Sequence, residues 1–376
     1  MNNERRVRVL NYAINGIGVG HITRLKAITQ WMHKLAPSLG IRLESFFVTS
    51  SDVDSLIGGD LPVFKVPSPS VLRMNAGYQM SLRLAARDCV WSIVERMRPD
   101  LLIMDTVPAG SFDEFLPYLG MDATELCRKK LFIYRPLRLS EASRAKFETM
   151  LPKYDLILVP EREATEEVFI PDSVRDRTEC SGPIISCNRS DLLDRESALK
   201  SLGLEERGLH VYVCVGGGGH RSAEDRILAT CRALEHVKDI QIIVGVGPLY
   251  RGKRAEGSNV VWLKSMDMAS HLAVVDVAIS AAGYNSFNEL MLAGIPTIFL
   301  PLEAAMDDQL KRAKRAEKVG AAVVLSDPHD QRLLDTIESW RHEANRAAAA
   351  AAARRLVPDS CTREVARRAM SLCDAM

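Results

Sequence analysis

Short apolar runs rich in β-branched residues alternate with amphipathic segments along the whole chain. In the first half, six runs have the length and composition of buried strands, at residues 7–14, 43–49, 62–66, 101–105, 130–134 and 156–159. Helix-period segments separate them, for example at 24–35 and 79–97. This alternation predicts a parallel sheet covered by helices on both faces.

The alternation stops near Gly182 and Pro183, where the sequence becomes charged, and then resumes. The second series has strand candidates at 209–215, 241–246, 259–263, 274–280, 297–300 and 321–325, with helical stretches such as 223–235 and 286–293. We therefore predict an α/β protein with two doubly wound parallel-sheet domains, joined by a linker over residues 183–207. An alanine-rich stretch that ends at Pro358-Asp359 predicts a helix, and a last helix follows over 361–373.

Composition restricts the class of protein without naming a function. The 376 residues suffice for two domains, and 47% hydrophobic with 26% charged residues is typical of a soluble globular chain. The net charge of +1 offers no electrostatic reason to expect nucleic-acid binding, so any anion site must be built locally.

The cysteines and the N-terminus indicate a cytoplasmic protein. The 8 cysteines are scattered, with neither a C-x-x-C motif nor zinc-ligand spacing, which favours reduced thiols, although Cys180 and Cys187 could pair in principle. No run approaches the roughly 20 apolar residues of a membrane span. The basic N-terminus has an apolar run interrupted by Asn11 and Asn15, which fits a first strand better than a signal peptide.

Three alternating glycines follow the first predicted strand in VLNYAINGIGVGHITRLKAITQWM, residues 9–32. A dinucleotide fingerprint would need glycine where His21 stands, yet Asp52 and Asp54 could serve as its acidic ribose ligand, so that alternative stays open. We favour a glycine loop that presents His21 at a helix N-terminus, where the local positive potential favours a neutral ring able to accept a proton. A buried or capping histidine is the structural alternative.

Four consecutive glycines follow a strand in VCVGGGGHRSAED, residues 213–225. Such a loop before a helix forms a nest of backbone N–H groups that suits a phosphate. It is not a Walker A loop, because no Gly-Lys-Ser/Thr follows. The alternative is a flexible turn without a ligand.

A third stretch, residues 276–325, places polar side chains after a predicted strand. The strand ends at Gly283, and Asn285 with Ser286 is expected to cap a helix that begins near Phe287. Glu289 then lies near the first turn, where it can accept two ribose hydroxyls or act only as a partner of the helix dipole.

Asp308 and Gln309 follow the next predicted strand and its loop. They either hydrogen-bond sugar hydroxyls or cap the next helix.

Taken together, three motifs resemble the GT-B glycosyltransferases, namely G-x-G-H-x-x-R at 18–24, the glycine loop at 216–219 and AAGYNSFNELMLAGIPTIFLPL…DDQLKRA within 281–313. The nearest resemblance is to the family-28-like group, which includes the N-acetylglucosaminyltransferase of peptidoglycan synthesis. Residues 99–119 and 154–163 are similar to a set of uncharacterised predicted glycosyltransferases in that group.

The resemblance implies two Rossmann-like domains that face each other across a cleft. Residues 1–182 would bind the acceptor and residues 208–356 the nucleotide-sugar donor. The tail, 357–376, would carry a helix that returns to the N-terminal domain.

It also implies roles at positions that match the family motifs. On the acceptor side they are Gly18, Gly20 and Arg24, with His21 as the base. Apart from the resemblance, Asp105 ends a predicted strand in the same half, where it either orients or assists His21 or caps a helix. On the donor side they are Gly217, Gly218, Gly219 and His220 for the diphosphate, Met266 for the nucleobase, Gly283, Asn285, Ser286 and Glu289 around the ribose, and Asp308 and Gln309 for the sugar. The loop has Gly-Gly-Gly-Gly-His where the family more often has Gly-Gly-Ser, so a hydroxyl contact to phosphate is missing, and Ser222 or His220 is the candidate substitute.

The activity implied is transfer of a sugar from a nucleotide donor, UDP-linked by expectation, to a small-molecule or lipid-linked acceptor, with inversion. Backbone amides and a helix dipole can stabilise the leaving diphosphate, so neither a metal nor another cofactor is expected.

Two rival functions remain open at this point. The opening motif also resembles the UDP-sugar hydrolase of pseudaminic acid synthesis, in which a histidine would activate water. The other rival is a non-catalytic nucleotide-sugar-binding protein.

A contact with a membrane surface is a further possibility. A helical stretch carries Arg73, Arg83, Arg87, Arg96 and Arg98, which suit either anionic lipid or a solvated helix face.

Overall fold

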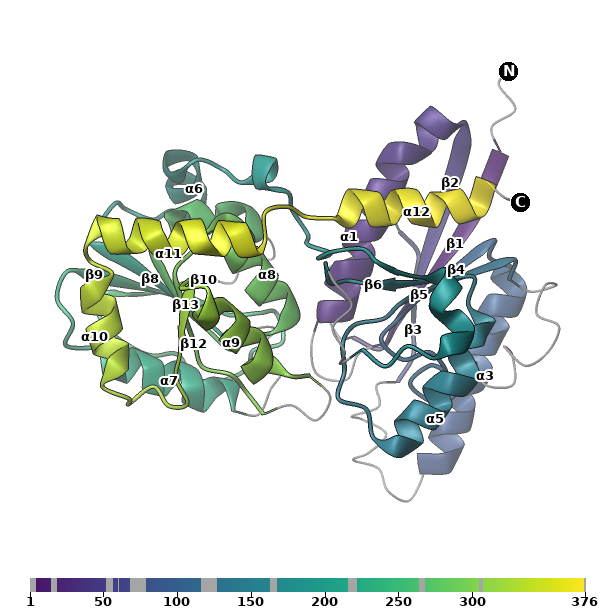
Figure 1. Cartoon of the computed structure of the whole chain (residues 1–376), viewed down its shortest axis with the longest axis horizontal. Helices are drawn as coiled ribbons and strands as arrows, with labels where there is room; N and C mark the ends of the chain where they lie inside the picture. Colours follow the sequence, from purple (N-terminus) through teal and green to yellow (C-terminus); the bar gives the residue numbers. More distant parts are fainter. Residues whose placement is uncertain are drawn as a thin grey trace. The chain divides into compact units, whose positions relative to one another are not determined.

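The computed structural model describes residues 5–14, 19–51, 57–59, 61–67, 79–115, 127–162, 168–215, 222–263, 268–303 and 307–374. The chain forms two compact units (Figure 1). One comprises Met1–Ile184 together with Cys361–Met376, and the other comprises Ile185–Ser360.

The first unit is built on a seven-stranded sheet in which all neighbours are parallel, in the order β3-β2-β1-β4-β5-β6-β7. Its strands are β1 (Arg5–Ala13), β2 (Ile41–Thr49), β3 (Val63–Lys65), β4 (Leu101–Asp105), β5 (Lys129–Ile133), β6 (Leu156–Val159) and β7 (Thr178–Cys180). Its helices are α1 (Gly20–Leu35), α3 (Gln79–Met97), α5 (Glu141–Met150) and α12 (Thr362–Asp374), with shorter 3-10 turns at Ala36–Leu39, Leu151–Lys153 and Asp172–Arg177.

Both faces of this sheet are covered, which explains why its strands are almost continuously apolar. Val9 of β1 faces a core shared with α1 and α12, where Ile28 and Met370 are buried. The next residue, Leu10, faces the opposite core, which α3 and α5 close with Val94 and Phe147.

The second unit repeats this plan with six parallel strands in the order β10-β9-β8-β11-β12-β13. The strands are β8 (Leu209–Cys214), β9 (Ile240–Gly245), β10 (Val260–Leu263), β11 (Val277–Ser280), β12 (Thr297–Phe299) and β13 (Ala322–Val324). The helices are α6 (Arg195–Leu202), α7 (Ala223–Leu234), α8 (Tyr284–Ala293), α9 (Gln309–Lys318), α10 (Arg332–Ser339) and α11 (Glu343–Leu356), with 3-10 turns η7 (Arg189–Asp191) and η8 (Ala269–Val274).

The predicted fold class, two doubly wound parallel sheets, is confirmed. In each sheet the strand order reverses beside the first strand, so one switch point lies between β1 and β4 and the other between β8 and β11. Open α/β sheets bind ligands outside the carboxyl ends of the strands at such points. All twelve predicted strands form, with small shifts at their ends.

Three details differ from the sequence prediction. The short edge strand β7 was not predicted, because three residues carry too little pattern. The strand expected over 274–280 begins only at Val277, because Ala269–Val274 winds into η8. The segment expected to be a linker, 183–207, belongs to the second unit from Ile185 onward and contains α6.

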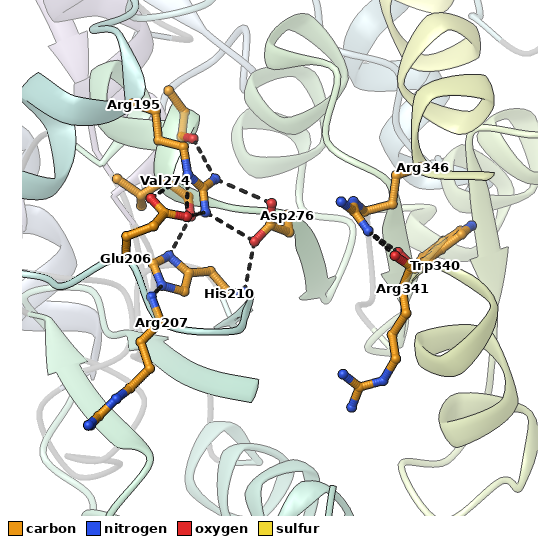
Figure 2. Close-up of polar contacts among 10 residues, drawn as sticks. Arg195, Glu206, Arg207, His210, Val274, Asp276, Trp340, Arg341 and Arg346 are labelled. Carbon is orange, nitrogen blue, oxygen red and sulfur yellow. Dashed lines mark hydrogen bonds and ion pairs between the residues drawn. The ribbon is translucent and has the colours of Figure 1, made fainter. Parts of the chain in front are cut away.

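An arginine explains why α6 belongs to the second unit. Arg195 at the start of α6 pairs with Glu206 at 2.8 Å and with Asp276, just before β11, at 3.2 Å, and donates to the carbonyl of Ala273 at 3.2 Å (Figure 2). The Asp276 carboxylate also accepts the backbone N–H of His210 at 2.8 Å. The segment that contains α6 is thus bonded to the amino ends of β8 and β11. Ligands of such sheets bind at the opposite, carboxyl ends of the strands.

The chain returns to the first unit at Cys361, whose backbone N–H donates to the Pro183 carbonyl at 2.9 Å. Gly182 adopts φ +77° here, and a Cβ on it would collide with the Cys361 sulfur, so glycine is required. α12 then packs against α1, as Figure 1 shows.

Two further observations concern the described part of the chain. All eight cysteines lie among the described residues and none of them forms a disulfide, so Cys180 and Cys187 are not joined to each other. Among the described residues, no helix combines the length and apolarity needed to cross a membrane.

We expect Arg195→Met to destabilise the second unit by about 2 kcal/mol, because Asp276 and the Ala273 carbonyl lose a charged hydrogen-bond partner. Urea denaturation gives the free energy of unfolding. Glu206→Gln is the matched control: Glu206 is largely exposed, and its loss should cost less than about 1 kcal/mol. Equal costs for the two variants would contradict the central role of Arg195.

Candidate active site

A buried ion pair occupies the switch point of the first unit. Asp105 is the last residue of β4, and its Oδ2 accepts hydrogen bonds from Arg24 Nη2 at 2.7 Å and Arg24 Nε at 3.2 Å. The two side chains are 0% and 1% exposed, respectively. Arg24 was expected on the acceptor side, and the structure buries it against Asp105.

His21 lies beside this pair as the second residue of α1. Its Nδ1 is 3.2 Å from Asp105 Oδ2, and its side chain is 16% exposed. Nδ1 is buried and meets no hydrogen-bond criterion, so this is a close contact between ring and carboxylate and not a formed hydrogen bond. The imidazole therefore lies next to the carboxylate at the carboxyl end of β4, and the His21 side chain is only partly exposed.

The electrostatics keep Asp105 ionised. Burial by itself would raise the pKa of the Asp105 carboxyl, but the charge and hydrogen bonds of Arg24, with a further contribution from the nearby His21 ring, outweigh it and hold that pKa well below its usual range. Among the helices whose N-cap is described, Asp105 is the N-cap of none, and its second oxygen accepts from Thr106 Oγ1 at 2.9 Å.

The backbone after Asp105 is strained. Thr106 has φ +72°, a left-handed conformation that is costly for a β-branched residue. Such strain persists only where surrounding contacts hold it, and the hydroxyl bond to Asp105 is one of them.

A second buried carboxyl, not singled out from sequence, holds the loop that follows. Glu114 is fully buried, accepts from the Tyr12 hydroxyl, and its Oε2 accepts from Phe112 N at 2.7 Å. Burial raises the pKa of Glu114. Gly110, at φ +84°, leaves room for this carboxyl, because a Cβ would collide with it. Its side-chain partner Tyr12 is distant in sequence, so no local pattern could have revealed that this glutamate is buried.

The second unit shows a related turn at its own switch point. After β11, Ala282 adopts φ +62° and Gly283 becomes the N-cap of α8. The helix thus begins at Tyr284, and the expectation that Asn285 and Ser286 cap a helix from Phe287 is wrong. The left-handed residue turns the chain early, which places both of these polar residues inside the first turn.

Glu289 lies in the second turn of α8, and no acidic residue occupies the first turn. Its alternative role as a capping or dipole partner is therefore removed. Glu289 is partly exposed, and its Oε1 accepts from Ser186 Oγ at 3.0 Å. Burial raises the pKa of the nearby Tyr212 hydroxyl, and Cys214 and Glu289 raise it further.

The side chains of Asp308 and Gln309 both accept hydrogen bonds from nearby backbone N–H groups. Asp308 is the N-cap of α9 and accepts from Lys311 N at 3.0 Å, so the capping role considered for it is present. Gln309 Oε1 accepts from Leu302 N at 2.9 Å. The capping bond uses one oxygen of Asp308, and a carboxylate retains acceptor capacity for a ligand as well.

Several predicted positions lie outside the described residues, and their places stay predictions. They are Gly18, Gly217, Gly218, Gly219, His220 and Met266, together with Asp52, Asp54 and Arg73. Gly20 is described and is the first residue of α1. Among the described residues, no group of three or more histidine, cysteine, aspartate or glutamate side chains is arranged to hold a metal ion.

Comparison with known proteins gives a family match over the second half of the chain. Residues 210–363 match the glycosyltransferase family 28 C-terminal domain. The UDP-N-acetylglucosamine–N-acetylmuramyl-(pentapeptide) pyrophosphoryl-undecaprenol N-acetylglucosamine transferase of Aquifex aeolicus is 31% identical over 217 residues, 55% of this chain and 58% of the relative. The enzyme of the same name from Desulfitobacterium hafniense is 31% identical over 147 residues, 36% of this chain and 40% of that relative.

Solved structures agree on the fold. The MurG structure from Acinetobacter baumannii superposes with a TM-score of 0.60 at 16% identity, covering 98% of this chain and 99% of that one. The spinosyn forosaminyltransferase SpnP gives 0.65 at 17% identity, with 98% and 99% covered. The fold is therefore GT-B. Residues 210–363 match the family 28 C-terminal domain, and the chain spans little more than half the length of the Aquifex relative, so the resemblance indicated by the motifs is supported over this part of the chain.

We expect Asp105→Asn to cost about 3 kcal/mol of stability at neutral pH, because it leaves Arg24 buried without its counter-charge. Since the pKa of Asp105 is lower in the folded protein, its ionisation stabilises the fold above pH ~4, and this contribution is lost as the pH falls further.

Urea denaturation of wild type and variant between pH 7 and pH 3 tests this. The gap between them should narrow below pH ~4. Asp155→Asn serves as control, because Asp155 pairs with Lys129 at a partly exposed site and should cost under about 1 kcal/mol. A gap that stays constant down to pH 3 would contradict the assignment.

Proposed function

We propose that this protein is a glycosyltransferase that moves a sugar from a UDP-linked donor to an acceptor hydroxyl with inversion. The observation that carries the proposal is His21 at the switch point, next to an ionised Asp105, in a chain that also has a family 28 C-terminal domain. The activity of the relatives, named as N-acetylglucosamine transferases, supports the same class of reaction.

His21 is proposed to act as the general base. With Asp105 beside Nδ1, the ring favours the tautomer that carries its proton there, which leaves Nε2 to accept a proton from the acceptor hydroxyl. The acceptor oxygen then bonds to the anomeric carbon as the bond from that carbon to the diphosphate breaks. Asp105 stabilises the imidazolium that forms, and Arg24 keeps Asp105 ionised for this task.

The second unit is proposed to bind the nucleotide sugar. Glu289 would accept ribose hydroxyls, exchanging its bond from Ser186, and Asp308 with Gln309 would contact the sugar. The glycine loop before α7 would bind the diphosphate through backbone amides, and this site supplies enough positive potential that no metal is required in the proposal. The choice of UDP follows the names of the relatives.

A lipid-linked acceptor is proposed ahead of a small soluble one. The relatives are named for a pyrophosphoryl-undecaprenol acceptor. On α3, Met80 and Leu84 are exposed beside Arg83, a combination suited to the surface of an anionic membrane, although Arg83 also approaches Asp113 at 3.9 Å.

A panel of nucleotide sugars and nucleotides tests donor binding. Ligand at 100 times its dissociation constant adds about 2.7 kcal/mol to stability. UDP-sugars and UDP should therefore raise the melting temperature, with and without EDTA, while Glu289→Gln abolishes this shift. No shift with any nucleotide sugar would contradict the proposal.

We expect His21→Gln to reduce turnover by about 10²–10⁴-fold with UDP affinity unchanged, because only proton transfer is lost. Turnover is measured as UDP released in the presence and absence of acceptor preparations, and UDP affinity by calorimetry. Undiminished turnover in the variant would remove His21 from the mechanism. Rapid UDP release by wild type without any acceptor would favour a hydrolase.

A further inference from the structure

A buried arginine in the second unit bonds to segments that the proposed mechanism uses separately. Arg312 of α9 is 7% exposed. Its Nη1 donates to the carbonyl of Ala282 at 2.8 Å, and its Nη2 pairs with Asp307 Oδ1 at 2.7 Å. The guanidinium carbon also lies 5.7 Å from the centre of the Tyr284 ring.

These three partners surround the starts of two helices. Ala282 is the left-handed residue two positions before α8, and Tyr284 is the first residue of α8. Asp307 directly precedes Asp308, the N-cap of α9. One guanidinium therefore fixes the beginning of the helix that carries Glu289 relative to the segment that carries Asp308 and Gln309.

We propose that Arg312 is a positioning residue that holds the sugar-contacting segment in register with the ribose-contacting helix, and so determines how strongly a nucleotide sugar is preferred over the bare nucleotide. This inference rests on the proposed function for the roles of Glu289, Asp308 and Gln309. Arg312 itself touches no substrate, because its guanidinium is buried and occupied by protein groups.

The chemistry of the side chain explains why arginine serves here. A planar guanidinium can donate in two directions at once, to a carbonyl and to a carboxylate. A lysine ammonium can pair with Asp307, but it lacks the fork that spans both partners. Without the bond to Ala282, the turn into α8 loses a contact that holds its left-handed residue, and α9 loses its fixed distance from that turn.

The side chain of Gln309 explains how this positioning affects binding of the sugar. Its Oε1 already accepts from Leu302 N, so the amide offers its –NH₂ group to a ligand and would donate to a sugar oxygen. A donor of this kind discriminates only if its position is fixed against the ribose contact. UDP makes only the ribose contact, whereas a UDP-sugar makes the ribose contact and the sugar contact. Loss of register should therefore weaken the binding of a UDP-sugar more than the binding of UDP.

Calorimetry with UDP and with UDP-N-acetylglucosamine tests the proposal in Arg312→Lys. UDP affinity should change by less than about threefold, while UDP-N-acetylglucosamine affinity falls by tenfold or more. Asp307→Asn, which keeps the bond to Ala282, should give a smaller change in the same direction. Parallel losses for both ligands, or no loss for either, would overturn the proposal.

Arg189→Lys is the matched control. Arg189 donates to the Leu292 carbonyl at 3.1 Å near the other end of α8, so its substitution disturbs the same helix away from the proposed register. It should leave the ratio of the two affinities unchanged. A change in that ratio equal to that of Arg312→Lys would show a general loss of order and would also overturn the proposal.

Hydrogen exchange of the ligand-free protein separates this inference from the proposed function. In Arg312→Lys, amides at 284–289 and at 307–311 should lose protection together, whereas Arg189→Lys should affect only the end of α8. If wild type binds neither ligand, the proposed function fails, and exchange alone decides whether Arg312 couples the helices. Loss of protection confined to α9 would refute the coupling.

Discussion

The buried contact between Arg24 and Asp105 is the interaction on which the candidate active site depends. A fully buried carboxylate is tolerated only when a positive charge compensates it. Arg24 supplies that charge to Asp105 through two hydrogen bonds. Because Asp105 ends a central strand and Arg24 lies on α1, the pair also fixes that helix relative to the sheet. His21 takes its position from both: α1 carries it, and Asp105 faces its ring.

The two units stabilise a strained turn after a central strand in a similar way. Each has a residue other than glycine in the left-handed region just after a central strand, Thr106 in one and Ala282 in the other. In each a buried arginine secures that turn, through the Asp105 carboxylate in the first unit and through the Ala282 carbonyl itself in the second. Strain at these positions is compensated by charge-assisted hydrogen bonds, which are short and directional.

Local pattern was enough to single out some candidate residues and missed others. His21 and Glu289 stand in motifs whose spacing places them after strands, so the sequence marks them as candidates. Arg312 and Glu114 have no such signal, since a lone arginine or glutamate on a charged segment is typically solvated. Their roles come from partners distant in sequence, Ala282 for Arg312 and Tyr12 for Glu114.

What the sequence by itself determined is the class of fold, the number of units, nearly all strands and the family resemblance, because periodicity and glycine motifs are local properties of the chain. The start of α8, the membership of α6 and the ionised state of Asp105 were decided only by tertiary structure. Each depends on a positive charge brought to a strand end from elsewhere in the chain: Arg312 at Ala282, Arg195 at Asp276 and Arg24 at Asp105. Burial then makes such contacts strong, and burial exists only once the chain has folded.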